Sequence, residues 1–252
     1  MEVKLRQSNS IAARLSLIVI VLIICCSKML SSCGKTGVMP RFSSLHITLK
    51  HTVDGDSIYL DPYQYLNEAG NVYSVTDLKY YISNIRLIGA DGNLYYDEII
   101  HYVDLSKTQS MSFVLDSIVP GLYSKISFDL GIDSTRNSTG SLTNTVDNLN
   151  MAWPITMGGG YHFLKFEGKF ISNGSNYGFA FHMGKSKSII HYEFDLNKKL
   201  NYWNEHITLN HNLSEWFKNP TTYDFDFFEP YTMNDDSVMQ VVQINGQDVF
   251  SL

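Results

Sequence analysis

Apolar side chains recur at every second position through much of the chain, which is the spacing of β-strands. Residues 45–49 (LHITL) and 190–196 (IHYEFDL) alternate in this way, and VMQVVQI at 238–244 is read as a similar segment. A fourth segment is expected to place four apolar residues on one face: Leu122, Ile126, Phe128 and Leu130. Aromatic residues make up 13% of the chain and suit half-buried strands.

Turn signals separate these segments, among them Asp54-Gly55, Pro120-Gly121 and Ser172-Asn173-Gly174. Helical periodicity is scarce, and the best short helix is LSEWFK at residues 213–218, with Asn212 or Ser214 as its cap. Many short strands joined by regular turns predict an all-β protein, an antiparallel sandwich or barrel.

One predicted strand changes phase along its length. Its apolar positions are even through Leu78, Tyr80 and Ile82, and odd through Ile85 and Leu87. A slip of one residue at Ser83-Asn84 (residues 83–84) predicts a β-bulge, which bends a sheet.

The N-terminal segment is predicted to be a leader. Basic residues precede an apolar run at residues 15–26, whose 12 residues are fewer than the roughly 20 that span a membrane. LSSCG follows, with Leu30 three residues before Cys33, and resembles a bacterial lipobox. The alternative, Cys25, follows two bulky isoleucines and fits such a cleavage site less well.

This interpretation divides the chain into three parts and assigns it to the cell envelope. Residues 1–32 are a lipoprotein signal peptide, residues 33–41 are the lipidated Cys33 and a tether, and residues 42–252 are one β-sandwich domain. Acyl chains on Cys33 would anchor the protein to a bacterial membrane, at the outer membrane or facing the periplasm, without spanning it.

Cysteine use and charge then exclude several classes of function. Cys25 and Cys26 would leave with the leader, and Cys33 would carry the lipid. The domain would then have no thiolate metal site and no cysteine nucleophile. Without the leader, the chain carries 15 basic and 24 acidic residues. Such a surface repels phosphate backbones, so nucleic acid is not an expected partner.

Motifs for catalysis are absent from the sequence. There is no G-x-S-x-G, no H-E-x-x-H and no phosphate-binding loop. The triplet Gly158-Gly159-Gly160 lacks a following Lys-Ser/Thr and is expected to supply backbone freedom at the start of a strand. The sequence therefore predicts a binding protein and not an enzyme.

Histidine and methionine provide the candidate chemistry. By strand parity His46, His191 and His206 fall on polar faces, whereas His162 shares a face with apolar residues and His182 shares one with the small residues Gly178 and Ala180. Met151 and Met157 flank Trp153. Imidazole and thioether together suit Cu(I). Packing in the core is the other reading of the same residues.

The order of motifs resembles the MbnP-like copper-binding proteins over residues 42–250. The segments that carry the resemblance are YSVTDLKYYISNIRL, HYVDL, VPGLYSKISFDLGIDSTRN, MAW with GGGYHFLKFEG, and FAFHMG. The resemblance implies a secreted or surface-attached β-sandwich that, in the copper binders of the family, holds copper through histidines and a tryptophan oxidised to kynurenine. Met151, Trp153 and Gly160-Tyr161 match its tryptophan motif, and His182 with Gly184 matches its H-x-G motif.

One position departs from that family pattern. Two residues after Trp153, where the copper binders offer histidine or a second aromatic residue, this chain has Ile155. Two interpretations follow: a copper-binding lipoprotein in which His162 or a methionine replaces the missing ligand, or a scaffold lipoprotein of the same fold without the metal. The sequence does not identify a protein partner.

Overall fold

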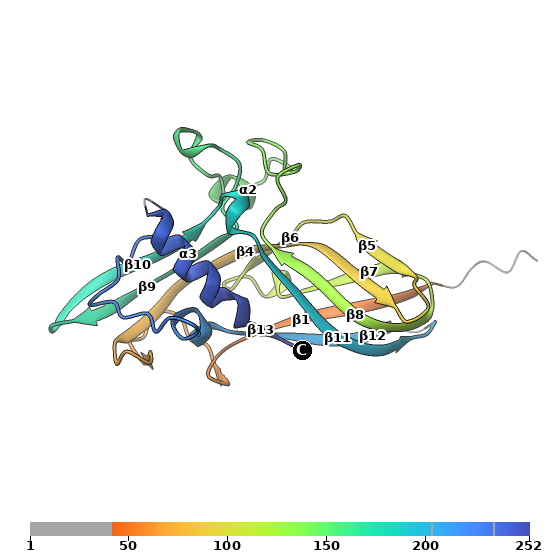
Figure 1. Cartoon of the computed structure of the whole chain (residues 1–252), viewed down its shortest axis with the longest axis horizontal. Coiled ribbons are helices and arrows are strands. Elements are labelled where there is room, and N and C mark those ends of the chain that lie inside the picture. Colours follow the sequence, from red (N-terminus) through yellow and green to blue (C-terminus); the bar gives the residue numbers. More distant parts are fainter. Residues whose placement is uncertain (1–41, 203, 234) are drawn as a thin grey trace, which may run out of the picture. The chain divides into compact units, whose positions relative to one another are not determined.

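The computed structural model describes residues 42–202, 204–233 and 235–252, which fold into two β-sheets (Figure 1). The predicted leader, Cys33 and the tether lie outside the described residues. The first sheet contains β1 (Ser43–Val53), β2 (Asp56–Ser57), β7 (Ser112–Ile118), β12 (Asn204–Asn212) and β13 (Phe250–Ser251). The second contains β3 (Tyr65–Leu66), β4 (Val72–Gly89), β5 (Leu94–Asp97), β6 (His101–Asp104), β8 (Gly121–Leu130), β9 (Leu164–Ser172), β10 (Ser175–Met183) and β11 (Ile190–Leu200).

The second sheet is organised around the 18-residue strand β4. At Lys79 and Tyr80, β4 pairs with β6 on one edge and with β9 on the other. Farther along β4, the edge that pairs with β9 pairs with β8 instead. The strand order of this sheet is β10-β9-β4-β8-β11. This arrangement places the β9–β10 hairpin, which carries His182, along the first half of β4.

Pairing is antiparallel throughout the second sheet, but the first sheet contains one parallel pair. Strands β1 and β12 run parallel in an unbroken register from Ser44↔Asn204 to Thr52↔Asn212. Alternation along β1 is as predicted, since Leu45 and Ile47 are fully buried and Leu49 nearly so. The all-β sandwich is therefore confirmed, with this parallel pair added to the antiparallel pattern.

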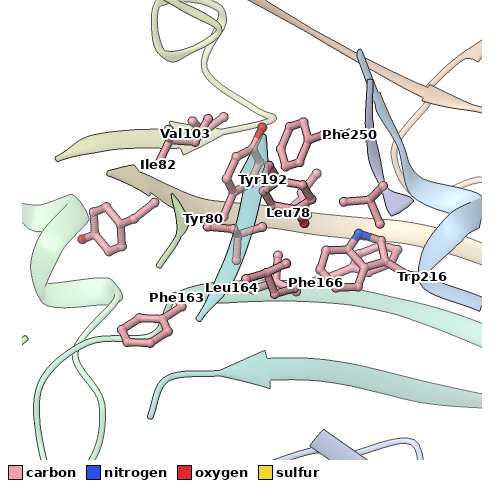
Figure 2. Close-up of a cluster of buried hydrophobic side chains, with 14 of the residues drawn as sticks. Leu78, Tyr80, Ile82, Val103, Phe163, Leu164, Phe166, Tyr192, Trp216 and Phe250 are labelled. Atoms are coloured by element: carbon pink, nitrogen blue, oxygen red, sulfur yellow. The ribbon is translucent and has the colours of Figure 1, made fainter. Parts of the chain in front are cut away.

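The core lies between the two sheets and is rich in aromatic rings. Phe250 of β13 lies 6.0 Å from the ring of Tyr80 and 5.3 Å from that of Phe128, both on the second sheet. Figure 2 shows part of this core, with Phe250 beside Tyr80 and Tyr192. Burial of such rings is the main apolar contribution to folding, and edge-on contacts between them add to it.

The predicted bulge at residues 83–84 is confirmed. Asn84 has φ +55°, and the pairing of β4 with β8 shifts between Ser83 and Arg86. Asparagine tolerates this left-handed conformation better than most residues. Its side-chain amide also donates to Asp129 Oδ2 at 2.7 Å, which ties the bulge to the neighbouring strand β8.

Two readings of the apolar pattern were wrong. Leu122 does not share the face of Ile126: it is 50% exposed, while Tyr123 is buried in its place. Irregular pairing of β8 with both neighbours, at Ile88/Gly89 and at Asp195/Lys198, shifts the alternation by one residue.

The segment 238–244, read as a strand, lies in the helix α3 (Asp236–Asn245). The side chain of Asp235 accepts hydrogen bonds from the backbone amides of Ser237 and Val238, which caps this helix. Its buried residues follow helical spacing: Val238, Met239, Val242 and Asn245. Figure 1 shows α3 near the β9–β10 hairpin.

The other helical segments are short. They are α2 (Val146–Asn150) and the 3-10 turns η1 (Thr108–Ser110), η2 (Ile155–Met157), η3 (Ser186–Ser188), η4 (Leu213–Phe217) and η5 (Gly246–Asp248). The helix expected at residues 213–218 is thus the 3-10 turn η4, and the side chain of Asn212 caps it as predicted. Within the described part of the chain, no helix has the length and apolar character needed to cross a membrane.

Candidate metal centre

The tryptophan and one histidine of the candidate site lie on a closed loop between α2 and β9. The amide of Trp153 donates to Gly160 O at 2.9 Å, and the amide of His162 donates to Met151 O at 2.6 Å. Three consecutive glycines make the turn, with φ values of +111°, +69° and +87° at Gly158, Gly159 and Gly160. Residues with a Cβ rarely adopt such angles, so the triplet has the backbone role predicted for it.

Trp153 is buried to 2% exposure and is fixed from two sides. Its indole Nε1 donates to Met157 O at 3.3 Å. Gly184, at the end of β10, lies against the six-membered ring: a Cβ added there would stand 2.2 Å from Trp153 Cε3. The glycine of the H-x-G motif is therefore needed so that the tryptophan ring can occupy this position.

His162 joins the tryptophan to the second histidine. Its ring centroid lies 4.7 Å from that of Trp153 and 5.0 Å from that of His182. Its Nδ1 lies 3.1 Å from the carbonyl oxygen of Met151, which fixes the proton on Nδ1 and leaves a lone pair on Nε2. That Nε2 is buried and has no hydrogen-bond partner within the described residues.

The environment keeps His162 neutral. Burial, together with the charge on a protonated His182, lowers the pKa of His162 to about 4. A neutral imidazole with a free, buried nitrogen is the form in which histidine binds metals. Buried polar atoms without a partner are rare, so Nε2 of His162 is the feature of this site that calls for a ligand.

His182 is held by a carboxylate and faces a thioether. Its Nε2 lies 2.8 Å from Glu167 Oε1, and its Nδ1 lies 3.2 Å from Met233 Sδ. The hydrogen bond from His182 lowers the pKa of Glu167 to about 2, so the carboxylate is ionised and only accepts. The proton therefore lies on Nε2, and in the neutral imidazole the lone pair of Nδ1 faces the sulfur lone pairs of Met233.

Met233 reaches this position through a short strand-like addition to β10. The amide of Ala180 donates to Pro230 O at 2.9 Å, and the amide of Thr232 donates to Ala180 O at 3.2 Å. Thr232 Oγ1 then accepts from the amide of His182 at 2.7 Å. The segment at 230–233 is thus anchored directly beside the histidine.

The structure brings together Trp153, His162 and His182, although the strand parity used to place His162 does not apply to it. His182 pairs with Lys165 and lies on that face of the hairpin, not on the face of Leu164. His162 precedes β9, where strand parity does not apply, and its ring turns toward His182. As predicted, His46, His191 and His206 are on the polar faces and are partly or fully exposed.

The predicted methionine ligands lie at the site, where Met151 and Met157 contact the histidine and the indole through carbonyl oxygens. Their role as sulfur ligands stays a prediction.

Ile155 lies in η2 and is 78% exposed, so the position of the expected family ligand faces solvent. No three His, Cys, Asp or Glu side chains in the described ranges are grouped to hold a metal. A metal here would therefore need sulfur or another donor besides the two imidazoles.

Sequence reasoning missed Glu167 and Met233. Glu167 lies two residues after Lys165, the pairing partner of His182, so the hairpin register identifies it once the two strands are aligned. Met233 lies 51 residues after His182 in a segment without strand or helix periodicity, and the sequence contains no signal for this contact.

Comparison with known proteins identifies the family. A family model described as MbnP matches residues 42–239, which include the site residues from Met151 to Met233. The chain belongs to the MbnP family.

The fold is similar to that of a solved structure, MbnP from Methylosinus trichosporium. The TM-score is 0.58 at 12% sequence identity, and the match covers 83% of this chain and 98% of the other. At this identity the likeness establishes a shared MbnP fold. No curated protein sequence matches the chain.

Proposed function

We propose that this member of the MbnP family is a cell-envelope lipoprotein that binds copper as Cu(I), for uptake or buffering. The observation that carries the proposal is the buried, unpartnered Nε2 of His162, 5.0 Å between ring centroids from His182. In this proposal Cys33 carries the lipid that attaches the protein to a bacterial membrane, and the domain binds the metal without catalysing a reaction.

The ligand set would be His162 Nε2, His182 Nδ1 and Met233 Sδ, beside the ring of Trp153. Two imidazoles and a thioether are donors that suit Cu(I). The thioether of Met233 would take the place of the ligand that is lost at Ile155. Glu167 would orient His182 and raise the basicity of its Nδ1, which is the usual role of a carboxylate behind a metal-bound histidine.

The proposal is tested by elemental analysis and Cu(I) competition titration of the purified protein, with and without added copper. Wild-type protein should bind one Cu(I), and His182→Ala or Met233→Leu should weaken binding by at least about 100-fold, since each removes a donor. His191→Ala is the matched control, because His191 is an exposed histidine that pairs with Asp129 on β8. Wild-type affinity in His182→Ala would refute this site.

A second candidate function is a scaffold lipoprotein that keeps the fold without the metal. The exposure of Ile155 favours it, since the usual ligand position is not directed at the site. This candidate predicts no copper in protein purified from copper-supplemented cells. It also predicts an unmodified mass for the peptide that carries Trp153, whereas oxidation to kynurenine would change that mass.

A further inference from the structure

The parallel pairing of β1 with β12 aligns histidines at two levels. His46 is the register partner of His206, and His51 is the register partner of His211. The two levels are five residues apart on each strand, and an odd spacing places them on opposite faces of the sheet. His46 and His206 therefore lie on the outer face, while His51 and His211 are buried in the core.

In the inner pair, the Nε2 atom of each histidine is already committed to a contact within the core. His51 Nε2 lies 2.9 Å from the hydroxyl of Tyr80, and His211 Nε2 accepts from the indole of Trp216 at 3.1 Å. Both rings are enclosed, since His211 is fully buried and His51 is 8% exposed. This pair is part of the packing.

In the outer pair His206 is exposed and His46 is partly exposed, and the two rings lie together. The ring centroids of His46 and His206 are 4.6 Å apart, and the ring planes differ by 24°. The register-aligned neighbours on the same face are uncharged: Ser44 with Asn204, Thr48 with Thr208, and Val114 of β7 beside His46. No lysine or arginine occupies these adjoining positions; on this face of β1 the nearest basic residue is Lys50, four residues from His46.

We propose that His46 and His206 form a second metal site, which takes a divalent ion such as Ni(II), Zn(II) or Cu(II). Imidazole suits these ions, and water would occupy the remaining positions because the site is open. The continuous backbone register holds the two imidazoles side by side, and rotation about the soft bond to each ring turns their nitrogens toward one ion. Binding of the second imidazole is then intramolecular, which is the source of chelate affinity.

This site differs in chemistry from the candidate copper centre. It offers two imidazoles and water, without a thioether, and it lies on the outer face of the first sheet, whereas His162 and His182 belong to the β9–β10 side of the second sheet. The two sites can therefore be tested independently.

The test is calorimetric titration of the full-length protein with NiCl2. Wild-type protein should bind Ni(II), and His46→Thr or His206→Thr should each weaken binding at least about tenfold, because each leaves a single imidazole. Threonine suits a strand and matches the neighbouring Thr48 and Thr208 pair, so both variants should keep the wild-type melting temperature. His191→Ala, which removes an exposed histidine that has no second histidine as its register partner, should bind Ni(II) as wild type does.

A further variant assigns the signal to this site. His182→Ala should retain the Ni(II) affinity of wild type, even where it has lost Cu(I). Equal Ni(II) binding in wild type and His46→Thr, absence of Ni(II) binding in wild type, or loss of that binding in His182→Ala would each overturn the proposal.

Discussion

Acid should destabilise this protein through the buried histidine His51, and the effect can be calculated. Burial lowers the pKa of His51 to about 4 from the ordinary histidine value of 6.5. The folded protein therefore binds a proton at His51 less readily than the unfolded chain does. Its contribution to stability is fully present above pH 6.5 and is lost progressively as the pH falls toward 4.

Each pKa unit corresponds to about 1.4 kcal/mol, so the full shift corresponds to about 3 kcal/mol. Between pH 7.5 and pH 5, the part of this loss that falls on His51 is about 2 kcal/mol. Small domains have a total stability of roughly 5–15 kcal/mol, so the loss should be easily measured by urea unfolding at the two pH values.

The decisive comparison is between wild type and His51→Gln, a variant that cannot titrate at this position. Its free energy of unfolding should fall about 2 kcal/mol less than that of wild type over this pH range. Tyr80→Phe is the matched control, because it removes the hydrogen-bond partner of His51 but leaves the buried imidazole. It should lose about 1 kcal/mol at both pH values and keep the wild-type pH dependence. Equal pH dependence in His51→Gln and wild type would refute the reasoning.

Two further predictions concern the candidate copper centre. Glu167→Gln should weaken Cu(I) binding about 10–100-fold by removing the charge behind His182. Glu193→Gln, which breaks an exposed ion pair with Lys125, should leave Cu(I) binding unchanged. Equal Cu(I) affinities of the two variants in a competition titration would contradict this role of Glu167. Gly184→Ala should shift the tryptophan fluorescence and cost about 1–3 kcal/mol, since its Cβ overlaps the Trp153 ring. Gly178→Ala, where the nearest atom is 3.4 Å from the added Cβ, should change neither in the same unfolding experiment.

The sequence predicted the faces of the strands better than it predicted their partners. Alternation in residues 45–49 identifies the buried side of β1, because burial on one face is a local requirement. It does not identify β12 as the parallel partner, since that pairing joins residues 160 positions apart. Segment 238–244 was misread because its apolar residues fit two periods, and the cap at Asp235 favours the helix.

The candidate site was predicted in part, for a similar reason. The residues Trp153, His162 and His182 lie on two segments that adjoin in the β9–β10 region, and the family-like motifs mark both. Strand parity does not apply to His162, because it precedes β9 and belongs to the closed loop. Met233 is brought in by backbone hydrogen bonds between residues 230–232 and β10, and this pairing leaves no periodic trace in the sequence.

The exposure of Ile155 and the position of Met233 bear on the same question. The short turn η2 carries Ile155 to the surface, where its side chain is 78% exposed and points into solvent. Replacing Ile155 by histidine should therefore not restore a family-like ligand. A donor has to come from elsewhere, and Met233 Sδ is the soft atom that lies 3.2 Å from an imidazole nitrogen of the site. Within the proposed copper function, a thioether in place of an aromatic or imidazole donor would shift the preference of the centre toward the reduced ion.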